Sequence, residues 1–345
     1  MWKYVLKRIG LALVTTFIIL SLTFILIKLL PFSKPIGTDE AMYSYYMHQV
    51  SLGFVQRERR IIPALGDYLW QYQTGNGQRF FFYQVPVMQQ YFSWLGNIFT
   101  KWDWGVSTYI KPNVSAIQII GERLPTSMGI NIISVLVSVP LGILLGILAA
   151  LKKNKTTDHI ISTGVMIFIS IPSFVLITIL MLIFCYNLEW LPTRWPTPSM
   201  PTSQKVLGYI LPVVCLSFGS ICGYARFTRA ELCEVMSSDY LLLARTKGLT
   251  KRQAIIRHAL RNAMVPIVPS ILAEFIMILG GSMILENLYG IPGIGEIFVI
   301  ALGQKDYNVL LVDMAIFTTI GLVAGVILDI SYGFIDPRIR MGAKK

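Results

Sequence analysis

Apolar residues in this chain gather into long runs that are broken by short polar stretches. Six of these runs are long enough to cross a bilayer, because a spanning helix needs roughly 20 mostly apolar residues. The runs cover residues 9–30, 129–151, 160–186, 207–224, 266–285 and 309–332. The pattern therefore predicts an all-α membrane protein with six transmembrane helices.

The first run follows three basic residues, Lys3, Lys7 and Arg8, as the core of a secretory signal peptide would. Its apolar part is longer than the roughly 7–15 residues of a signal peptide, and no small-residue cleavage site follows it. We therefore expect residues 1–30 to form a retained transmembrane helix.

Charged residues indicate the orientation in the membrane. The chain carries 30 Lys and Arg against 18 Asp and Glu, a net charge of +12, yet only 14% of its residues are charged, against roughly 25% in soluble domains. The N-terminus, residues 152–159, residues 225–265 and the C-terminal tail hold 18 of the 30 basic residues, and the short loops on the other side hold 3. Cytoplasmic loops carry such an excess, so both termini are expected in the cytoplasm. Because topology explains the charge, no nucleic-acid partner is expected.

The apolar runs and the charges divide the chain into four parts. We expect residues 1–30 to form the first helix, 31–125 an extracytoplasmic segment, 126–335 a five-helix core, and 336–345 a cytoplasmic tail. The extracytoplasmic segment holds 19 of the 41 aromatic residues, which favours packing at the membrane interface or docking of a partner. The core contains a large cytoplasmic loop at residues 225–265.

Residues that carry catalysis or bind metal ions form no recognisable pattern. The four cysteines make no C-x-x-C pair and the three histidines lie far apart in the sequence, so neither a metal site nor a disulfide framework is predicted. The chain also lacks the G-x-x-x-x-G-K-[ST] loop that cradles nucleotide phosphates. We therefore predict no catalytic residues, no cofactor and no enzymatic activity.

Local signals in the cytoplasmic loop predict two short helices that meet at a glycine. Asp239 can cap a helix that runs to Thr246, and Gly248 suits the left-handed residue that ends a helix. Thr250 and Gln253 have the spacing of a capping box, which opens a second helix through Met264. Such a pair forms a stiff knob that another subunit could push.

The sequence of this loop resembles a known family. Ala244-Arg-Thr-Lys-Gly248-Leu, followed by Arg257-His-Ala-Leu-Arg-Asn262-Ala and Pro266, is similar to the "EAA" coupling loop of ABC importer permeases, in the B-type subunit of the oligopeptide/dipeptide branch. Leu242 and Leu243 depart from the literal motif, and residues 32–87 show little resemblance. Further similar stretches are Glu122–Thr126, Pro140–Gly146, Ile171–Phe174, Trp190–Pro192, Glu286, Pro292–Gly295, Asp306-Tyr307 and Asp329–Arg340.

The resemblance implies a subunit of an ATP-driven importer in the bacterial cytoplasmic (inner or plasma) membrane, forming half of the pathway for oligopeptides or dipeptides. Its implied partners are a second, homologous permease in a heterodimer, two cytoplasmic ABC ATPases, an extracytoplasmic peptide-binding protein and membrane lipid. The resemblance leaves nickel complexes and oligosaccharides open as cargo. A stand-alone secondary transporter or channel is the alternative.

The resemblance also suggests which residues contact the ATPase. They are Asp239, Tyr240, Leu241, Ala244, Arg245, Lys247, Gly248 and Leu249. Among these, Leu241, Ala244 and Gly248 are expected to form the packed contact, whereas the basic residues could equally face anionic lipid.

Charges inside apolar spans are costly and suggest function. Glu274 could line the translocation path or bond a neighbouring helix, whereas Asp313 and Asp329 are expected to serve packing. The glycine-rich stretch before the last span could form a gate or docking hairpin at the outer mouth. Its candidate residues are Glu286, Pro292, Gly293 and Gly295.

Overall fold

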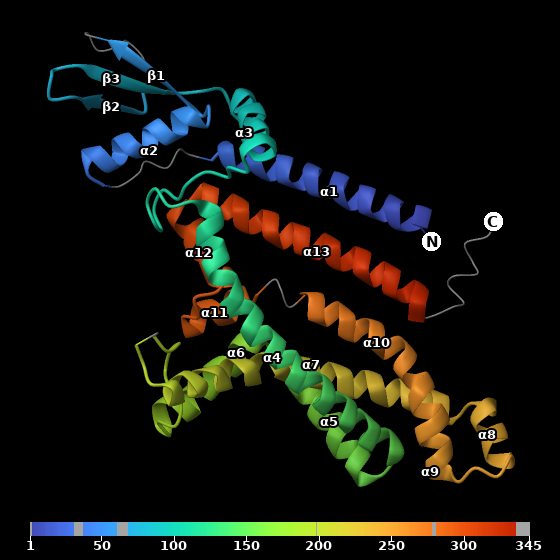
Figure 1. Ribbon diagram of the computed structural model, residues 1–345. Helices are drawn as coiled ribbons and strands as arrows, with labels where there is room; N and C mark the ends of the chain where they lie inside the picture. Colours follow the sequence, from blue (N-terminus) through green and yellow to red (C-terminus); the bar gives the residue numbers. More distant parts are fainter. Residues whose placement is uncertain (1, 31–36, 61–67, 198, 278–280, 336–345) are drawn as a thin grey trace. The chain divides into compact units, whose positions relative to one another are not determined.

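The computed structural model describes residues 2–30, 37–60, 68–197, 199–277 and 281–335, and these form a mainly helical protein (Figure 1). The chain divides into two compact units. The first unit comprises residues 126–296 with the two ends of the chain, 1–6 and 320–345. The second unit comprises residues 7–125 and 297–319.

Helices make up the described part of the first unit and continue into the second where they cross the division. In order they are α4 (Ala116–Leu151), α5 (Thr156–Ile169), α6 (Ser173–Met181) with the π-helical turn η1 (Leu182–Asn187), α7 (Thr202–Met236), α8 (Asp239–Thr246), α9 (Lys251–Ala254) with the π-helical turn η2 (Ile255–Ala259), α10 (Leu260–Met277), α11 (Met283–Tyr289), α12 (Ile294–Gln304) and α13 (Tyr307–Ile335).

Four helices of the described chain, α1 (Trp2–Lys28), α4, α7 and α13, are long and apolar enough to cross a membrane. Two bent pairs raise the number of candidate spans to six, if each pair is one span. One is α5 and α6, bent by 97° where Pro172 follows Ile171, and the other is α11 and α12, bent by 84°. A proline disfavours helix at the preceding residue, which explains why the expected 160–186 span is broken.

The expected span over residues 266–285 is also not one continuous helix. α10 ends at Met277, and α11 starts at Met283. Gly281 between them has a φ of +65°, a conformation that suits glycine and interrupts a helix.

Helices α4 and α7 of the first unit approach closely through glycines. A Cβ atom added at Gly142 would lie 2.6 Å from the Cβ atom of Tyr224, and one added at Gly146 would lie 2.6 Å from that of Thr228. Both distances are too short for real atoms, so these glycines allow the helix backbones to pack directly.

The second unit contains α1, α2 (Asp39–Ser51), α3 (Val87–Lys101) and a small antiparallel sheet. Strands β1 (Val55–Arg60), β2 (Trp70–Gln73) and β3 (Arg79–Gln84) are arranged in the order β1-β3-β2. The expectation of an all-α protein is therefore wrong for this segment. Strands β2 and β3 are rich in aromatic residues, which favour strands, and the 75–77 Gly-Asn-Gly sequence lies in the β2–β3 turn.

The aromatic residues of this unit pack mainly on one another. Tyr46 of α2 stacks on Trp70 of the sheet with ring centroids 5.1 Å apart, and Phe82 is fully buried beside them. Phe24 of α1 stacks on Trp94 of α3 at 4.7 Å. Much of the aromatic enrichment of the outer segment thus serves its own core.

Candidate functional site

The α8–α9 segment forms the knob that the sequence predicts. Leu241 of α8 is only 5% exposed and belongs to a buried cluster built from α4, α7, α8, α9, η2 and α10. The other buried members are Ala150, Leu232, Ala254, Ala259 and Ala263. Small residues on the surrounding helices therefore leave room for one leucine that anchors α8.

The ends of the two helices follow local rules. Gly248 has a φ of +94°, as expected for the glycine that ends α8. The Gln253 backbone N–H donates to the Thr250 hydroxyl (3.3 Å) and the Thr250 N–H donates to the Gln253 side chain (3.1 Å), which confirms the capping box. The helical segment that starts here continues beyond Met264 through η2 and α10.

The expected cap of α8 is wrong in one detail. Ser238 occupies the N-cap position and Asp239 is the first residue of the helix, with no side-chain cap bond. The Asp239 carboxylate still lies at the positive end of the helix dipole, where a negative charge is favourable.

The exposed face of the knob is apolar at Leu242 and Leu243, the two positions that depart from the literal EAA motif. Leu242 and Leu243 are 62% and 56% exposed, and Tyr240 is 40% exposed. Leu241, which the sequence places in the expected packed contact, has its side chain buried within this chain. From the sequence, Leu242 and Leu243 were recognised only as departures from the motif. Two adjacent leucines in a polar loop were the available signal for an exposed apolar face.

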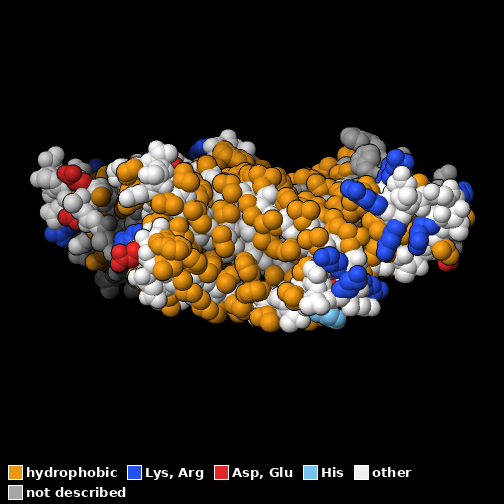
Figure 2. Space-filling model, turned by 90° about the horizontal axis from the view of Figure 1, so that it is seen from below, with side chains coloured by type: hydrophobic (Ala, Val, Ile, Leu, Met, Phe, Trp, Pro, Cys, Tyr) orange, Lys and Arg blue, Asp and Glu red, His pale blue; other side chains and the backbone are white. Residues whose placement is uncertain are grey.

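The remaining predicted residues of the knob lie around this apolar face. Ala244 and Leu249 are half-buried, whereas Arg245 and Lys247 are exposed. Lys and Arg side chains gather over the end of the unit that carries α8 and α9 (Figure 2). A surface cavity of about 210 Å³ lies between the base of α8 and α9, and its lining includes Met236, Ser238, Leu241, Leu242, Arg245 and Ile255.

A partly buried ion pair joins two helices of the same unit. The Arg229 guanidinium of α7 donates to both carboxylate oxygens of Asp158, at 2.5 and 2.8 Å. The fully buried Asp158 side chain also accepts hydrogen bonds from the Asn154 N–H and the Ser162 hydroxyl. The pair fixes the start of α5 against α7, and no sequence pattern connects these residues, which lie 71 positions apart.

Glu286 organises the hairpin between α11 and α12. Its carboxylate is 3% exposed and accepts four hydrogen bonds: from the Ser127 hydroxyl (2.8 Å) and from the backbone N–H groups of Ser282 (3.2 Å), Gly295 (2.7 Å) and Glu296 (3.1 Å). The carboxylate therefore caps the first turn of α12 and closes the hairpin.

The glycines of the hairpin make room for this carboxylate. A Cβ atom at Gly293 would overlap the carboxylate of Glu286 and the hydroxyl of Ser127, and one at Gly295 would lie 2.7 Å from the Met283 nitrogen. The structure thus brings the predicted residues Glu286, Gly293 and Gly295 together. Pro292 of the hairpin lines a cavity of about 470 Å³ with Thr126, Trp195, Lys205 and Tyr209.

The hairpin is also tied to the segment after η1. The Tyr289 hydroxyl donates to the Pro192 carbonyl oxygen (2.9 Å), and the Trp195 N–H donates to the Tyr289 carbonyl oxygen (3.0 Å). The segment at Pro192 and the hairpin at Tyr289 therefore lie in contact, although they are far apart in the sequence.

The charged residues of the spans differ in their surroundings. Glu274 of α10 is half-buried and faces the hydroxyl of Tyr224 of α7, so it contacts a neighbouring helix, as one of its two expected roles requires. Asp313 is fully buried within α13, and Asp329 is half-buried in the same helix.

Gly280 and the tail motif from Asp336 to Arg340 lie outside the described residues. In the ranges that the structure describes, no three His, Cys, Asp or Glu side chains are grouped to hold a metal ion.

Comparisons with known proteins agree with the sequence resemblance. The family model described as "Binding-protein-dependent transport system inner membrane component" matches residues 142–341. The dipeptide transport system permease protein DppB of Lactococcus lactis is 33% identical, with 99% of this chain and all of the relative aligned. The oligopeptide transport system permease protein OppB of Haemophilus influenzae is 31% identical over 99% of this chain and all of its own length. Both alignments thus extend through most or all of residues 32–87.

A solved structure supports the fold. A chain of the MetNI methionine ABC transporter, in an inward-facing conformation, aligns with a TM-score of 0.51 and 17% identity, over 64% of this chain and 97% of that chain. The relatives are named as permeases, which confirms the prediction that this chain is a transport component and not an enzyme. The family model and the relatives over the full length lead to one conclusion: this chain belongs to the binding-protein-dependent transport system inner membrane components, the permease subunits of ABC importers.

Proposed function

We propose that this chain forms half of the translocation pathway of an ATP-driven importer for oligopeptides or dipeptides. The names of the full-length relatives support this cargo, since they are dipeptide and oligopeptide permeases. The chain has no phosphate-binding loop of its own, so ATP hydrolysis belongs to separate cytoplasmic subunits.

The α8–α9 knob is the contact through which those subunits act on this chain. The observation that carries this proposal is the exposed apolar face of Tyr240, Leu242 and Leu243 on a helix anchored by the buried Leu241. Exposed apolar groups of this kind typically mark a protein contact. Arg245 and Lys247 at its edge supply charges that can orient an acidic partner. Because Leu241 of α8 packs in one cluster with residues of α7 and α10, a movement of the knob caused by the ATPase subunits is transmitted to both helices.

The proposed complex contains four further subunits. They are a second, homologous permease that completes the pathway, two ABC ATPases on the cytoplasmic side and an extracytoplasmic peptide-binding protein. The excess of Lys and Arg at both termini and in residues 225–265 supports cytoplasmic termini, an extracytoplasmic segment over residues 31–125 and a location in a bacterial cytoplasmic membrane.

The outer hairpin serves as a gate that moves as one piece. The four hydrogen bonds of Glu286 and the close fit of Gly293 and Gly295 hold its shape. Glu286 therefore acts by positioning the hairpin, and Pro292, at its outer side, is the residue available to meet cargo or the binding protein. Glu274 is the candidate for the path itself, since its side chain is partly accessible.

A substitution at Gly248 tests the coupling role. Valine at a φ of +94° is strongly disfavoured, so Gly248→Val deforms the knob, and ATP-driven peptide uptake should fall by at least about tenfold, equivalent to about 1.4 kcal/mol. Gly164→Val in α5 is the control, because its backbone is not left-handed and a Cβ there meets no atom within 4 Å. Normal uptake and ATPase stimulation in the Gly248→Val importer would contradict the role of the knob.

Purification in mild detergent with the products of neighbouring genes tests the composition. Recovery of a second permease and two ATPases, with activity raised by a peptide-loaded binding protein, supports the complex. Recovery of this chain alone, active in transport without ATP, would instead indicate the stand-alone transporter.

A further inference from the structure

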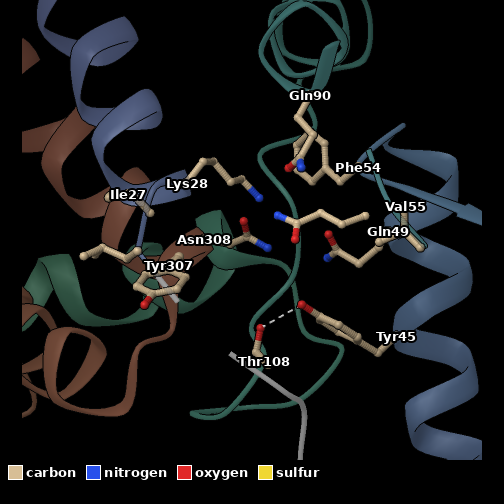
Figure 3. A pocket seen from close by; sticks show the side chains of 12 residues that line it. Ile27, Lys28, Tyr45, Gln49, Phe54, Val55, Gln90, Thr108, Tyr307 and Asn308 are labelled. Carbon is tan, nitrogen blue, oxygen red and sulfur yellow. Dashed lines mark hydrogen bonds between the residues drawn. The ribbon is translucent and has the colours of Figure 1, made fainter. Parts of the chain in front are cut away.

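A polar cavity lies inside the second unit, where the end of α1 meets α2 and the start of α13 (Figure 3). Its volume is about 40 Å³. The side chains of Lys28, Tyr45, Gln49 and Asn308 come from these three helices and converge on it, together with Gln90 of α3. Three carboxamides, a phenol and an ammonium group in so small a space are unusual beside an apolar span.

Among the described residues, the ammonium group of Lys28 lies against two aromatic rings. It lies 4.2 Å from the ring centroid of Phe54 and 5.5 Å from that of Phe24. Within the described ranges of the chain, Lys28 has no carboxylate partner. Aromatic faces stabilise a cation in part, but a half-buried ammonium group loses part of its hydration and favours a counter-charge.

The carboxylate of Asp306, which also belongs to this unit, uses one of its two oxygens, and its buried Oδ1 has no hydrogen-bond partner among the described residues. One of its oxygens accepts hydrogen bonds from the Ser107 hydroxyl and from three consecutive backbone N–H groups, at distances between 2.5 and 3.1 Å. Those three donors are Thr108, Tyr109 and Ile110. Asp306 therefore stabilises the 107–110 turn and is not an ion-pair partner of Lys28.

Donor groups around the cavity are available to a ligand. The Gln49 side chain is 3% exposed, its Nε2 has no hydrogen-bond partner, and its carboxamide points into the cavity (Figure 3). The Tyr45 hydroxyl accepts a hydrogen bond from Thr108 (3.3 Å), which leaves its own hydrogen free. Burial raises the pKa of Tyr45 to about 12, so this hydrogen stays in place at neutral pH. Asn308 uses one amide hydrogen on the Val106 carbonyl oxygen (2.8 Å) and has a second one.

We propose that this cavity binds one small monovalent anion, held by the ammonium of Lys28 and by hydrogen bonds from Gln49, Tyr45 and Asn308. The anion supplies the counter-charge for Lys28 and satisfies the buried amide of Gln49. A cavity of about 40 Å³ exceeds the roughly 10–15 Å³ that one water-sized probe needs, so it has room for an ion of chloride or formate size. Gluconate, a large organic anion, does not fit. The proposal is independent of the transport function, because it concerns only the second unit.

Thermal unfolding of the purified full chain in nanodiscs tests this site. Sodium chloride or sodium formate replaces sodium gluconate at constant ionic strength, and the unfolding midpoint is followed against anion concentration. The wild-type midpoint should rise in a saturating way by about 2 °C or more, because a ligand that binds only the folded state stabilises it. Lys28→Met should abolish the rise, and Gln49→Leu should weaken the apparent affinity by at least about threefold. Lys101→Met, at an exposed lysine of the same unit, should leave it unchanged.

Several outcomes would overturn the proposal. They are the absence of saturation in the wild type, an equal rise with gluconate, and an equal rise in both Lys28→Met and Gln49→Leu. If Lys28→Met does not fold, Gln49→Leu is the deciding variant, and an unchanged apparent anion affinity in it would overturn the proposal.

Discussion

The Glu286 carboxylate should contribute strongly to the stability of the first unit. The substitution Glu286→Gln keeps the size of the side chain but replaces one acceptor oxygen with an NH₂ donor. One oxygen accepts from Ser127 and Ser282, and the other accepts from the backbone N–H groups of Gly295 and Glu296. The NH₂ group fits best beside Ser127, whose hydroxyl can turn to accept. The Ser282 N–H then loses its partner.

The magnitude follows from these bonds. An unpaired buried N–H costs about 1–3 kcal/mol, and a hydrogen bond that loses its charged acceptor weakens by about 1 kcal/mol. Glu286→Gln should therefore lower the free energy of unfolding by about 3 kcal/mol. Glu286→Ala removes all acceptors and leaves three backbone donors unpaired, so its cost should be larger, about 5 kcal/mol.

Thermal unfolding in detergent, at one fixed heating rate, measures the effect. We expect the midpoint to fall by about 5 °C or more in Glu286→Gln and further in Glu286→Ala. Glu234→Gln, at an exposed glutamate of α7, is the matched control and should unfold as the wild type does. A Glu286→Gln midpoint within about 1 °C of the wild type would show that the carboxylate does not hold the hairpin.

Three other contacts yield predictions. Gly146→Ala should cost about 1–3 kcal/mol of unfolding free energy, because the added Cβ would lie 2.6 Å from that of Thr228; Gly164→Ala is the control, and an unchanged midpoint would contradict the close α4–α7 contact. Asp158→Asn should cost about 2–3 kcal/mol, since Arg229 is partly exposed and water replaces some of the lost interaction. Combining it with Arg229→Gln should cost less than the sum of the two single changes, and strict additivity in this cycle would show that the pair is not coupled. Asp306→Asn should raise hydrogen exchange at the amides of Thr108, Tyr109 and Ile110 by at least about tenfold, and unchanged protection would exclude its role in that turn.

Local signals in the sequence predicted local structure well. The glycine at 248 and the Thr250–Gln253 box set two helix ends, and each depends only on residues within a few positions. Ile171-Pro172 was an equally local signal for a break in the third span, and sequence analysis missed it because the apolar run continues through it. The aromatic strands β2 and β3 were missed for a related reason, since attention to spanning helices left the alternation at residues 70–73 unused.

Contacts between distant residues could not be predicted in this way. Asp158 meets Arg229 across 71 positions, and Ser127 meets Glu286 across 159 positions. No period or spacing in one sequence connects such pairs, because the packing of whole helices brings them together. The direction of Leu241 into the core and of Leu242 and Leu243 to the surface depends on the same packing. This is why residues of the coupling knob could be named from sequence but not assigned to its inner and outer faces.

Site-directed photo-cross-linking from the knob tests the proposed coupling most directly. Benzoylphenylalanine replaces Leu242 in the chain co-expressed with its partner subunits, and a second variant carries it at Trp102, an equally exposed apolar residue of the outer unit. Irradiation of intact cells should cross-link residue 242, but not residue 102, to an ATPase subunit. An assembled and active importer in which residue 242 gives no ATPase adduct, or in which residue 102 gives the same adduct, would contradict coupling through α8.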